Sequence, residues 1–522
     1  MASTAKSSRY AACLACLLAP AWAGAAAWKF TPGISLAELY TDNIDLSSSA
    51  TRQSDWITEV RPNFTLRRQG ARLRAEVDYS LQGLYYAQGT HGTRFRHYLN
   101  GRANAELVED WFFLDASARS SQAPRSLSSG TGYGAGNPVG ISNTSSVAAY
   151  TLSPYLKHRF GSLATVEARI EHSGVFIGDA GTSDAGITRY SLNATSGSAP
   201  YPLSWSAQYL KTDNDNRGGG VADTGGEQGS INARYQLTRT FGILGQAGLE
   251  KHDYPGVTAN IRDYTYYGLG FFYTPGRRFS MDMLFNDSDN GTFISGRMSA
   301  HPTLRTSIDV SSSQRAYGRS NAVGVAHRTR RSNWSLRYQD DLTNYQQQFL
   351  SYTGSLFMYQ CPSGIEYQPP GVPPSDPVNC TLVQVINLYS PTLSNTTYLA
   401  KSLTGAVSYT RRRNTWTLSV YENKRAFKSL AGGTDETRGM QASWTIKAAA
   451  NTTYSLSGGL ARNEESASSR SDDLWNLALV ATRQFNPKTT GSVEVRHQER
   501  SSTQAGDDYK ENSVAARLNM IF

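Results

Sequence analysis

The sequence predicts an all-β protein: a transmembrane antiparallel β-barrel of about 24 strands, with an uncertainty of two or more. Apolar and polar residues alternate over runs of about ten residues, the length at which a tilted strand crosses a bilayer. Short connections alternate with long ones, as in outer-membrane barrels. Only 39% of the 522 residues are apolar, yet the chain has 30 Tyr, 18 Phe and 9 Trp. A barrel explains this composition because only one face of each strand meets lipid.

The clearest hairpin is expected over residues 56–86. One face of its first strand carries Trp56 and Val60, whereas the other carries Glu59 and Arg61. Soluble strands rarely keep such alternation beyond about six residues. Pro62 interrupts the pattern, and because proline has no amide hydrogen it predicts a bulge or a lost ladder bond.

Connections of two lengths alternate along the chain. Short ones are expected near 69–70, 109–110, 161–162, 275–276, 301–302, 330–331, 412–413 and 486–487. Long ones are expected near 41–54, 87–94, 122–146, 176–186, 214–227, 343–396, 426–435 and 500–508. Short turns are periplasmic and long loops extracellular in such barrels, so residues 343–396 should form a long extracellular loop.

Both ends of the chain indicate export to a bacterial outer membrane. Residues 1–27 have a basic start, a short apolar core and small residues, which predicts a signal peptide cleaved after residue 23 or 27. Residues 28–522 are then a single barrel domain, with both mature termini periplasmic. The final strand alternates up to Phe522, which we expect to lie in the periplasmic aromatic girdle and to act as an assembly signal.

Two of the four cysteines, Cys361 and Cys380, lie outside the predicted signal peptide. An even pair in an exported chain predicts a disulfide, because the envelope outside the inner membrane is oxidising.

Motifs for other chemistry are weak. The glycine-rich 130–136 is predicted to be a loop instead of a phosphate cradle, which needs a strand before it and a helix after it. The acidic 213–216 and 286–290 lack calcium-site spacing, and His252 and Asp253 would point to opposite faces of a strand. The sequence therefore predicts no catalytic, cofactor-binding or metal-binding residue, no cofactor, no enzyme activity and no nucleic-acid partner.

Basic residues recur on the polar face of the predicted strands, with acids between them. The predicted lumen-facing basic residues are Arg61, Arg67, Arg72, Arg74, Arg102, Arg169, Arg234, Arg305 and Arg337. One interpretation is a set of cross-strand ion pairs that holds a wide barrel in shape. A second, compatible interpretation is a weakly basic conduit for an anionic solute or polymer.

Three segments carry a family resemblance: "LAELYTDNIDLS" at 36–47, "SDWITEVRPNFTL" at 54–66 and "NAELVEDWFFLDASA" at 104–118. They resemble the signature segments of the PEP-CTERM system-associated outer-membrane protein family, over nearly the whole chain. The resemblance implies a barrel linked to exopolysaccharide export and exosortase protein sorting. Expected partners are outer-membrane lipid and lipopolysaccharide, the barrel-assembly machinery and exopolysaccharide-export components. The resemblance implies no catalytic residue.

Three functions remain open at this point. The first is a conduit in exopolysaccharide export, for an anionic saccharide. The second is a general diffusion porin, because 343–396 is long enough to fold into a lumen. The third is a structural barrel without transport.

Overall fold

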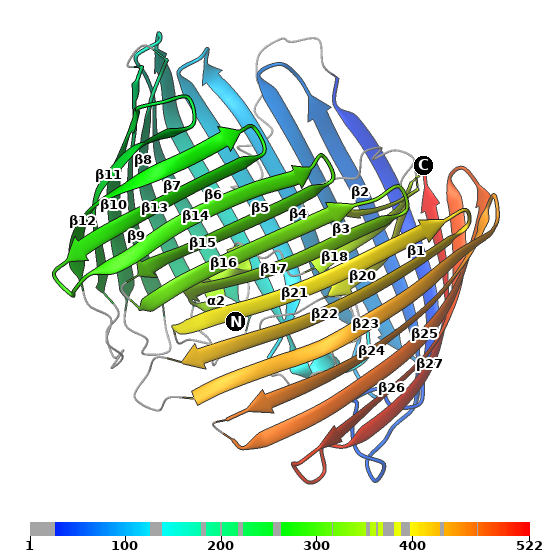
Figure 1. Cartoon of the computed structure of the whole chain (residues 1–522). Helices are drawn as coiled ribbons and strands as arrows, with labels where there is room; N and C mark the ends of the chain where they lie inside the picture. The colour runs from blue at the N-terminus through cyan, green and yellow to red at the C-terminus, as the bar shows by residue number, and fades with distance from the viewer. Residues whose placement is uncertain are drawn as a thin grey trace.

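The computed structural model is a closed antiparallel barrel of 24 strands (Figure 1), which confirms the predicted fold class. It describes residues 27–125, 138–178, 184–198, 201–217, 223–253, 263–315, 317–350, 355–361, 364–368, 381–387, 397–427, 433–466 and 468–522. The predicted signal peptide, apart from residue 27, and Cys380 lie outside these ranges. The signal peptide and the disulfide therefore stay predictions.

Each barrel strand pairs with its neighbours in sequence order. The first half comprises β1 (Lys29–Thr41), β2 (Asp55–Gln69), β3 (Leu73–Tyr86), β4 (Arg94–Val108), β5 (Phe112–Pro124), β6 (Thr144–Phe160), β7 (Ala164–Ile177), β8 (Asp184–Ser196), β9 (Leu203–Arg217), β10 (Thr224–Gln236), β11 (Phe241–Asp253) and β12 (Tyr264–Gly276). The second half comprises β13 (Phe279–Ser288), β14 (Phe293–Thr303), β15 (Thr306–Arg315), β16 (Gly318–Arg328), β17 (Ser332–Thr343), β21 (Tyr398–Arg411), β22 (Asn414–Phe427), β23 (Gly433–Ala449), β24 (Thr452–Glu465), β25 (Arg470–Asn486), β26 (Thr489–Ser502) and β27 (Tyr509–Ile521).

The first and last strands close the barrel. β1 pairs antiparallel with β27, from Gly33 opposite Ile521 to Thr41 opposite Ser513. The amide of Phe522 donates to the carbonyl oxygen of Pro32 at 2.9 Å. Closure leaves no edge strand, so every strand has partners on both sides.

Pro62 and Pro154 interrupt ladder pairing without shifting the register, whereas Pro275 of β12 and Pro302 of β14 lie at register shifts next to short turns. Pairing of β2 with β3 is interrupted between Val60 and Asn63, on either side of Pro62, and the register is the same before and after. Of the two outcomes expected at Pro62, the structure therefore shows lost ladder bonds and not a bulge. Pro154 of β6 interrupts the pairing with β7 in the same way.

Short and long connections alternate as predicted, with local corrections. Two short turns lie at residues 277–278 and 304–305, a few residues after the positions expected from sequence. The connection 289–292, at the opposite end of the barrel, is also short. The weak alternation of β14 and β16 explains the errors, because it blurs the strand boundaries.

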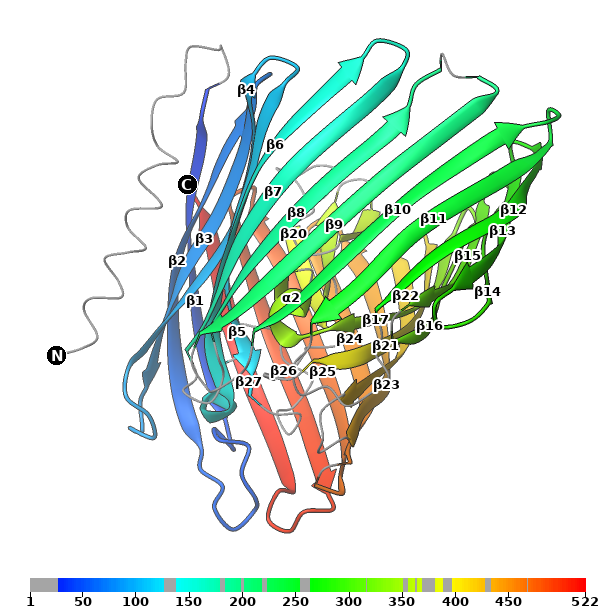
Figure 2. The ribbon, with the colours of Figure 1, turned by 90° about the vertical axis from the view of Figure 1, so that its left-hand side faces the viewer.

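The long connection between β17 and β21 folds into the barrel. It contains helix α2 (Tyr345–Leu350) and a three-stranded sheet of β18 (Ser355–Cys361), β19 (Gly364–Gln368) and β20 (Thr381–Asn387). Two perpendicular views show α2 and β20 inside the barrel, enclosed by its wall (Figure 2). A second connection, between β5 and β6, contains the short 3₁₀ helix η1 (Ile141–Asn143).

The outward face of the barrel is a band of exposed apolar side chains. Its members include Leu36, Val60, Leu152, Leu192, Ile243, Leu269, Phe285, Leu418, Leu456, Leu477, Val495 and Val514. Exposed aromatic residues such as Trp334, Trp416 and Phe485 lie next to short turns, where interface girdles are found in outer-membrane barrels. Among the described residues, no helix is long and apolar enough to span a membrane.

Candidate functional site

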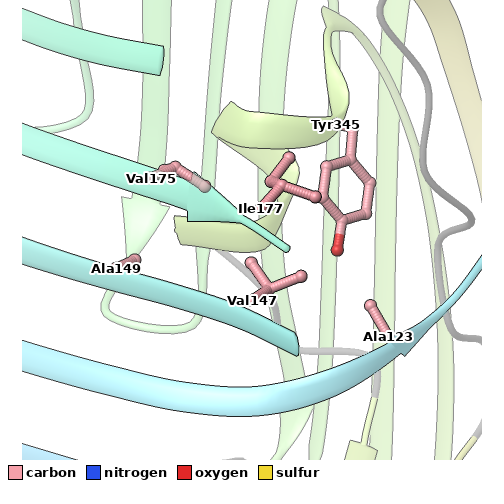
Figure 3. Packing of buried hydrophobic residues seen from close by; sticks show 6 residues of the cluster. All are labelled: Ala123, Val147, Ala149, Val175, Ile177 and Tyr345. Atoms are coloured by element: carbon pink, nitrogen blue, oxygen red, sulfur yellow. The ribbon is translucent and has the colours of Figure 1, made fainter. Parts of the chain in front are cut away.

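Helix α2 identifies the inner face of the wall. Tyr345 is 1% exposed and packs in a cluster with Ala123, Val147, Val175 and Ile177 of β5, β6 and β7 (Figure 3). Side chains alternate between the two faces of a strand, and residues paired directly across antiparallel strands share a face. The strand registers therefore extend the inner face around the whole barrel.

A second segment packs on the inner face near the extracellular end. Val139 and Ile141, beside η1, are buried against Ile57, Leu84 and Tyr86 of β2 and β3. The hydroxyl of Tyr86 donates to the carbonyl oxygen of Pro138 at 3.1 Å. Two inward-folded segments thus occupy part of the lumen.

The inner faces of β2–β8, here called the charged wall, carry a connected set of ion pairs. Glu76 accepts from both Arg67, at 2.7 Å, and Arg102, at 2.6 Å, and its side chain is only 17% exposed. Thr65 donates to Asp78 at 2.6 Å on the same face. Each guanidinium in this group is neutralised by a shared carboxylate.

Arg169 is the centre of a second group on the charged wall. Its guanidinium lies 2.8 Å from Asp115 and 3.3 Å from Glu167. It also lies 3.8 Å from the centroid of the Tyr155 ring, which stacks on Phe113. Cation–π contact and two carboxylates hold this side chain flat against the wall.

Two further predicted arginines are paired. Arg61 lies 3.0 Å from Glu59, a buried carboxylate that also accepts from Gln82 at 2.9 Å. Arg234 of β10 makes a bidentate pair with Asp282 at 3.0 and 3.1 Å. Bidentate pairs of this kind are strong and fix the geometry of both side chains.

The remaining four predicted lumen-facing arginines lie in turns or are exposed on their strands. Arg72 lies in the turn before β3, 60% exposed, and pairs with Glu109 at 2.5 Å. Arg305 also lies in a turn, between β14 and β15. Arg74 and Arg337 are exposed strand residues for which no ion pair is found within the described ranges.

The inner faces of β13–β17 and β21, here called the small-residue wall, contrast with the charged wall. Along their registers lie Ser299, Ser311, Ala322, Gly324 and Thr404. Arg337 is opposite Thr404, which shares a strand face with Tyr398, and the Tyr398 hydroxyl donates to Gln348 of α2 at 2.6 Å. Arg337 therefore points into the lumen.

Sequence reasoning missed a buried polar group near the extracellular end. Glu250 is 2% exposed and accepts from His252 at 2.7 Å, Tyr264 at 3.1 Å and Arg315 at 3.2 Å. In the loop that follows Arg315, burial raises the pKa of Tyr317 to about 12. The spacing of Glu250 and His252, two apart on one strand, was the available signal.

Buried ion pairs at the extracellular ends of β22–β25 were missed as well. Arg425 and Asp435 are both buried and lie 2.9 Å apart. Arg470 lies 2.9 Å from Asp472 and 2.7 Å from Asp507. The polar run around Arg425 hides the alternation, so sequence alone could not assign its face. No group of ligands that could hold a metal ion occurs among the described residues.

Comparisons with known proteins find structural similarity at low sequence identity. No protein-family model and no curated protein matches the sequence. Similar solved structures include the siderophore receptor PirA from Pseudomonas aeruginosa, at 10% identity and TM-score 0.41, covering 95% of this chain and 80% of that one. The FrpB iron transporter from Neisseria meningitidis matches at 10% identity and TM-score 0.46, covering 94% and 82%. OccK1 (OpdK) from Pseudomonas aeruginosa matches at 8% identity and TM-score 0.36, covering 95% and 99%.

The closed sheet, the outward apolar band and the polar inner face together define the class of molecule. The chain is an outer-membrane β-barrel. Phe522 lies at its closing seam and is 64% exposed, and its role as an assembly signal stays a prediction.

Proposed function

We propose that the barrel conducts hydrophilic solutes across the outer membrane, through a lumen narrowed by its own inward-folded segments. The packing of Tyr345 against Val147, Val175 and Ile177 supports this proposal, because it seats α2 on the inner wall. Barrels of this strand number enclose a wide lumen, and those that transport selected solutes fill it in part. An inner face of ion pairs and hydroxyl groups suits polar cargo.

The cargo that we propose is an exopolysaccharide or a related saccharide. Two observations support it: the resemblance to an exopolysaccharide-associated family and an inner wall that offers paired guanidinium and carboxylate groups beside aromatic rings. Arg169 on Tyr155 is the clearest example. A strain without the chain should retain polymer in the periplasm, and a strain that secretes normal amounts would exclude this cargo.

A general diffusion porin is the second candidate, and the inward position of α2 favours it. The two candidates differ in what passes. A porin should give equal permeation rates for saccharides and for unrelated solutes of the same size. A saccharide conduit should show saturable permeation of the saccharide alone.

The proposed lipid partner is supported by ion pairs on the outward face above the apolar band. Lys424 lies 3.3 Å from Glu436, and Arg438 lies 3.2 Å from Glu464. We place these groups at the level of the polar layer of the outer leaflet, where lipopolysaccharide phosphates are available to the cations.

Conductance in a planar bilayer tests the channel. Replacing residues 344–397 by a short Gly/Ser linker should raise the single-channel conductance several-fold, because the segment no longer occupies the lumen. Thr343 and Tyr398 are paired neighbours, so a short linker can join them. Shortening 503–508 is the matched control and should leave conductance unchanged.

Tyr345→Ala is a milder variant that keeps the loop and should increase current fluctuations by loosening α2. A complete lack of conductance in the full chain and in both variants would leave only a structural barrel.

A further inference from the structure

Four consecutive short turns of the barrel are unusually basic. They join β12–β13, β14–β15, β16–β17 and β21–β22, at the end of the barrel where β1 begins and β27 ends. The residues called the basic rim are Arg277, Arg278, Arg305, Arg328, Arg330, Arg331, Arg411, Arg412 and Arg413. The segments 274–280, 300–306, 327–333 and 409–415 contain no Asp or Glu.

The strand registers bring several of these arginines side by side. The amide of Arg328 donates to the carbonyl oxygen of Arg305 at 2.7 Å, and the amide of Thr410 donates to that of Arg331 at 2.7 Å. Arg305, the last residue of the β14–β15 turn, therefore lies opposite Arg328 of β16. Like charges in this position destabilise a sheet, so the arrangement costs the barrel stability unless an anion neutralises it.

The basic rim has no acidic partner within the barrel. All of its arginines are exposed, and none forms an ion pair with a carboxylate in the described part of the chain. One short turn below the charged wall differs, because Glu109 of the β4–β5 turn pairs with Arg72 of the β2–β3 turn. The basic rim is thus distinguished by nine arginines within four neighbouring turns, and not by the absence of acids, which other short turns such as 161–163 share.

The rim continues into the lumen. Arg328 lies four residues from Gly324 on β16, and Gly324 is opposite Arg337 on the inner face. Arg297 of β14 is a further exposed arginine on this wall, opposite Ser311 of β15 and Asp282 of β13. Cations without an ion pair among the described residues therefore extend from the turns to the middle of the small-residue wall.

We propose that the basic rim binds a polyanionic saccharide at the periplasmic mouth and directs it into the lumen. Guanidinium groups recognise carboxylate and phosphate oxygens through paired hydrogen bonds. Neighbouring strands lie about 4.8 Å apart, so Arg305, Arg328 and Arg331 form a row of closely spaced charges. A row of this kind suits a polymer with repeated anions, and a mouth lined by one sign of charge concentrates such a polymer.

Arg328 shares the inner face with Arg337, and the Arg305 carbonyl oxygen accepts from the Arg328 amide, so we place both side chains at the mouth and not toward the surrounding bilayer. For this reason the inference favours a soluble polyanion over anionic phospholipid. It rests on the proposed conduit function for its physiological meaning, but the binding itself is measured without transport.

The test compares two triple variants of the full chain in nanodiscs. Arg305→Gln/Arg328→Gln/Arg331→Gln removes three rim charges. Arg217→Gln/Arg319→Gln/Lys401→Gln removes three exposed charges at the extracellular end, as a matched control. The probes are an alginate oligosaccharide, whose uronates carry repeated carboxylates, and a neutral dextran of similar length.

At low salt the rim variant should bind alginate about tenfold more weakly than the wild-type chain, whereas the control should stay within about twofold. Dextran binding should not differ among the three proteins. In planar bilayers, alginate should block wild-type current from the periplasmic side at lower concentration than from the extracellular side.

Each alternative outcome is decisive. Equal alginate binding by all three proteins, in a channel that conducts, would overturn the inference and leave the conduit intact. Alginate binding that depends on the rim in a barrel without conductance would support the inference and refute the conduit. The third outcome is that vesicles containing phosphatidylglycerol bind more weakly to the rim variant, whereas alginate does not. This outcome would show that the rim binds lipid and would overturn the inference.

Discussion

The two inner walls of the barrel differ in how most of their arginines are paired. The exceptions are Arg74 on the charged wall, for which no ion pair is found among the described residues, and Arg315 on the small-residue wall, which pairs with Glu250. On the charged wall, Arg67 and Arg102 share Glu76, and Arg169 lies between two carboxylates. On the small-residue wall, Arg297 and Arg337 are exposed, and no carboxylate pairs with either one among the described residues. Paired arginines hold neighbouring strands together, whereas unpaired ones leave their charge available to a solute.

The comparison separates ion-paired charge from exposed charge in one molecule. Strand length follows the same division, because the strands of the small-residue wall from β13 to β17 have 10–12 residues, whereas β2–β8 have 13–17. The longer strands offer more cross-strand positions for ion pairs. A basic residue on the inner face is therefore no evidence for anion transport until its partners are known.

The largest expected effect is a loss of stability on the charged wall. Glu76→Gln removes the carboxylate that Arg67 and Arg102 share, and should lower the free energy of unfolding by roughly 2 kcal/mol because two half-buried cations lose their partner. Urea titration of the protein in detergent or liposomes measures the change.

Asp309→Asn is the matched control on the small-residue wall. Asp309 is exposed and accepts one hydrogen bond, from Ser299 at 2.7 Å, so the change should be within about 0.5 kcal/mol. Equal losses in the two variants would remove the proposed difference between the walls.

The next effect is on ion selectivity. Arg297→Gln/Arg337→Gln should lower the ratio of anion to cation permeability about two- to threefold at 0.1 M salt, and much less at 1 M, where the Debye length falls from about 10 Å to about 3 Å. Reversal potentials across a salt gradient measure this ratio.

Arg189→Gln/Glu171→Gln is the control for that measurement. It removes an ion pair at 3.0 Å on the charged wall without changing the net charge, so its reversal potential should match that of the wild-type chain. A shift as large as that of the arginine variant would show that paired and unpaired charges act alike.

The smallest effect concerns pH and the short loop above β13 and β14. Hydrogen bonds from the hydroxyl and the amide of Thr265, at 2.7 and 3.0 Å, lower the pKa of Asp289. A depressed folded-state pKa adds stability above the unfolded value, near 3.9, and this stability disappears as pH falls through the folded pKa.

Thr265→Val should therefore lower the urea midpoint of unfolding slightly at pH 7. At the lowest pH that keeps the barrel folded, the midpoint should be the same as in the wild-type chain. The difference between the two proteins, followed from pH 7 downward, is the measurement. A stability difference between the two proteins that grows as the pH falls would contradict this prediction.

Sequence reasoning predicted the wall better than the lumen. Alternation over residues 56–86 predicted β2 and β3, because each strand has one face toward lipid and one away from it. The same pattern predicted that Arg61 and Arg169 lie on the polar face. It could not show that Glu59 and Asp115 neutralise them, because cross-strand register depends on strand tilt and turn length.

Residues outside regular alternation were harder to predict. Arg72 and Arg305 share the parity of inner residues, but each lies in a turn. The position of Tyr345 in the lumen follows from a long connection folding back onto β5–β7, and no periodic pattern encodes such a contact. The basic rim was visible in the sequence, but its meaning depends on neighbours that only the structure brings together.

The pairing of β1 with β27 sets the order in which this molecule can form. Gly33 and Ile521 are neighbours in the wall although nearly the whole chain separates them. The seam therefore cannot close before the C-terminal strand has been synthesised and exported. Until then β1 has one unpaired edge, and an open strand edge is a site of aggregation. A chain that stalls before β27 should thus depend on periplasmic chaperones for its solubility, and it should be more sensitive to their loss than the complete chain.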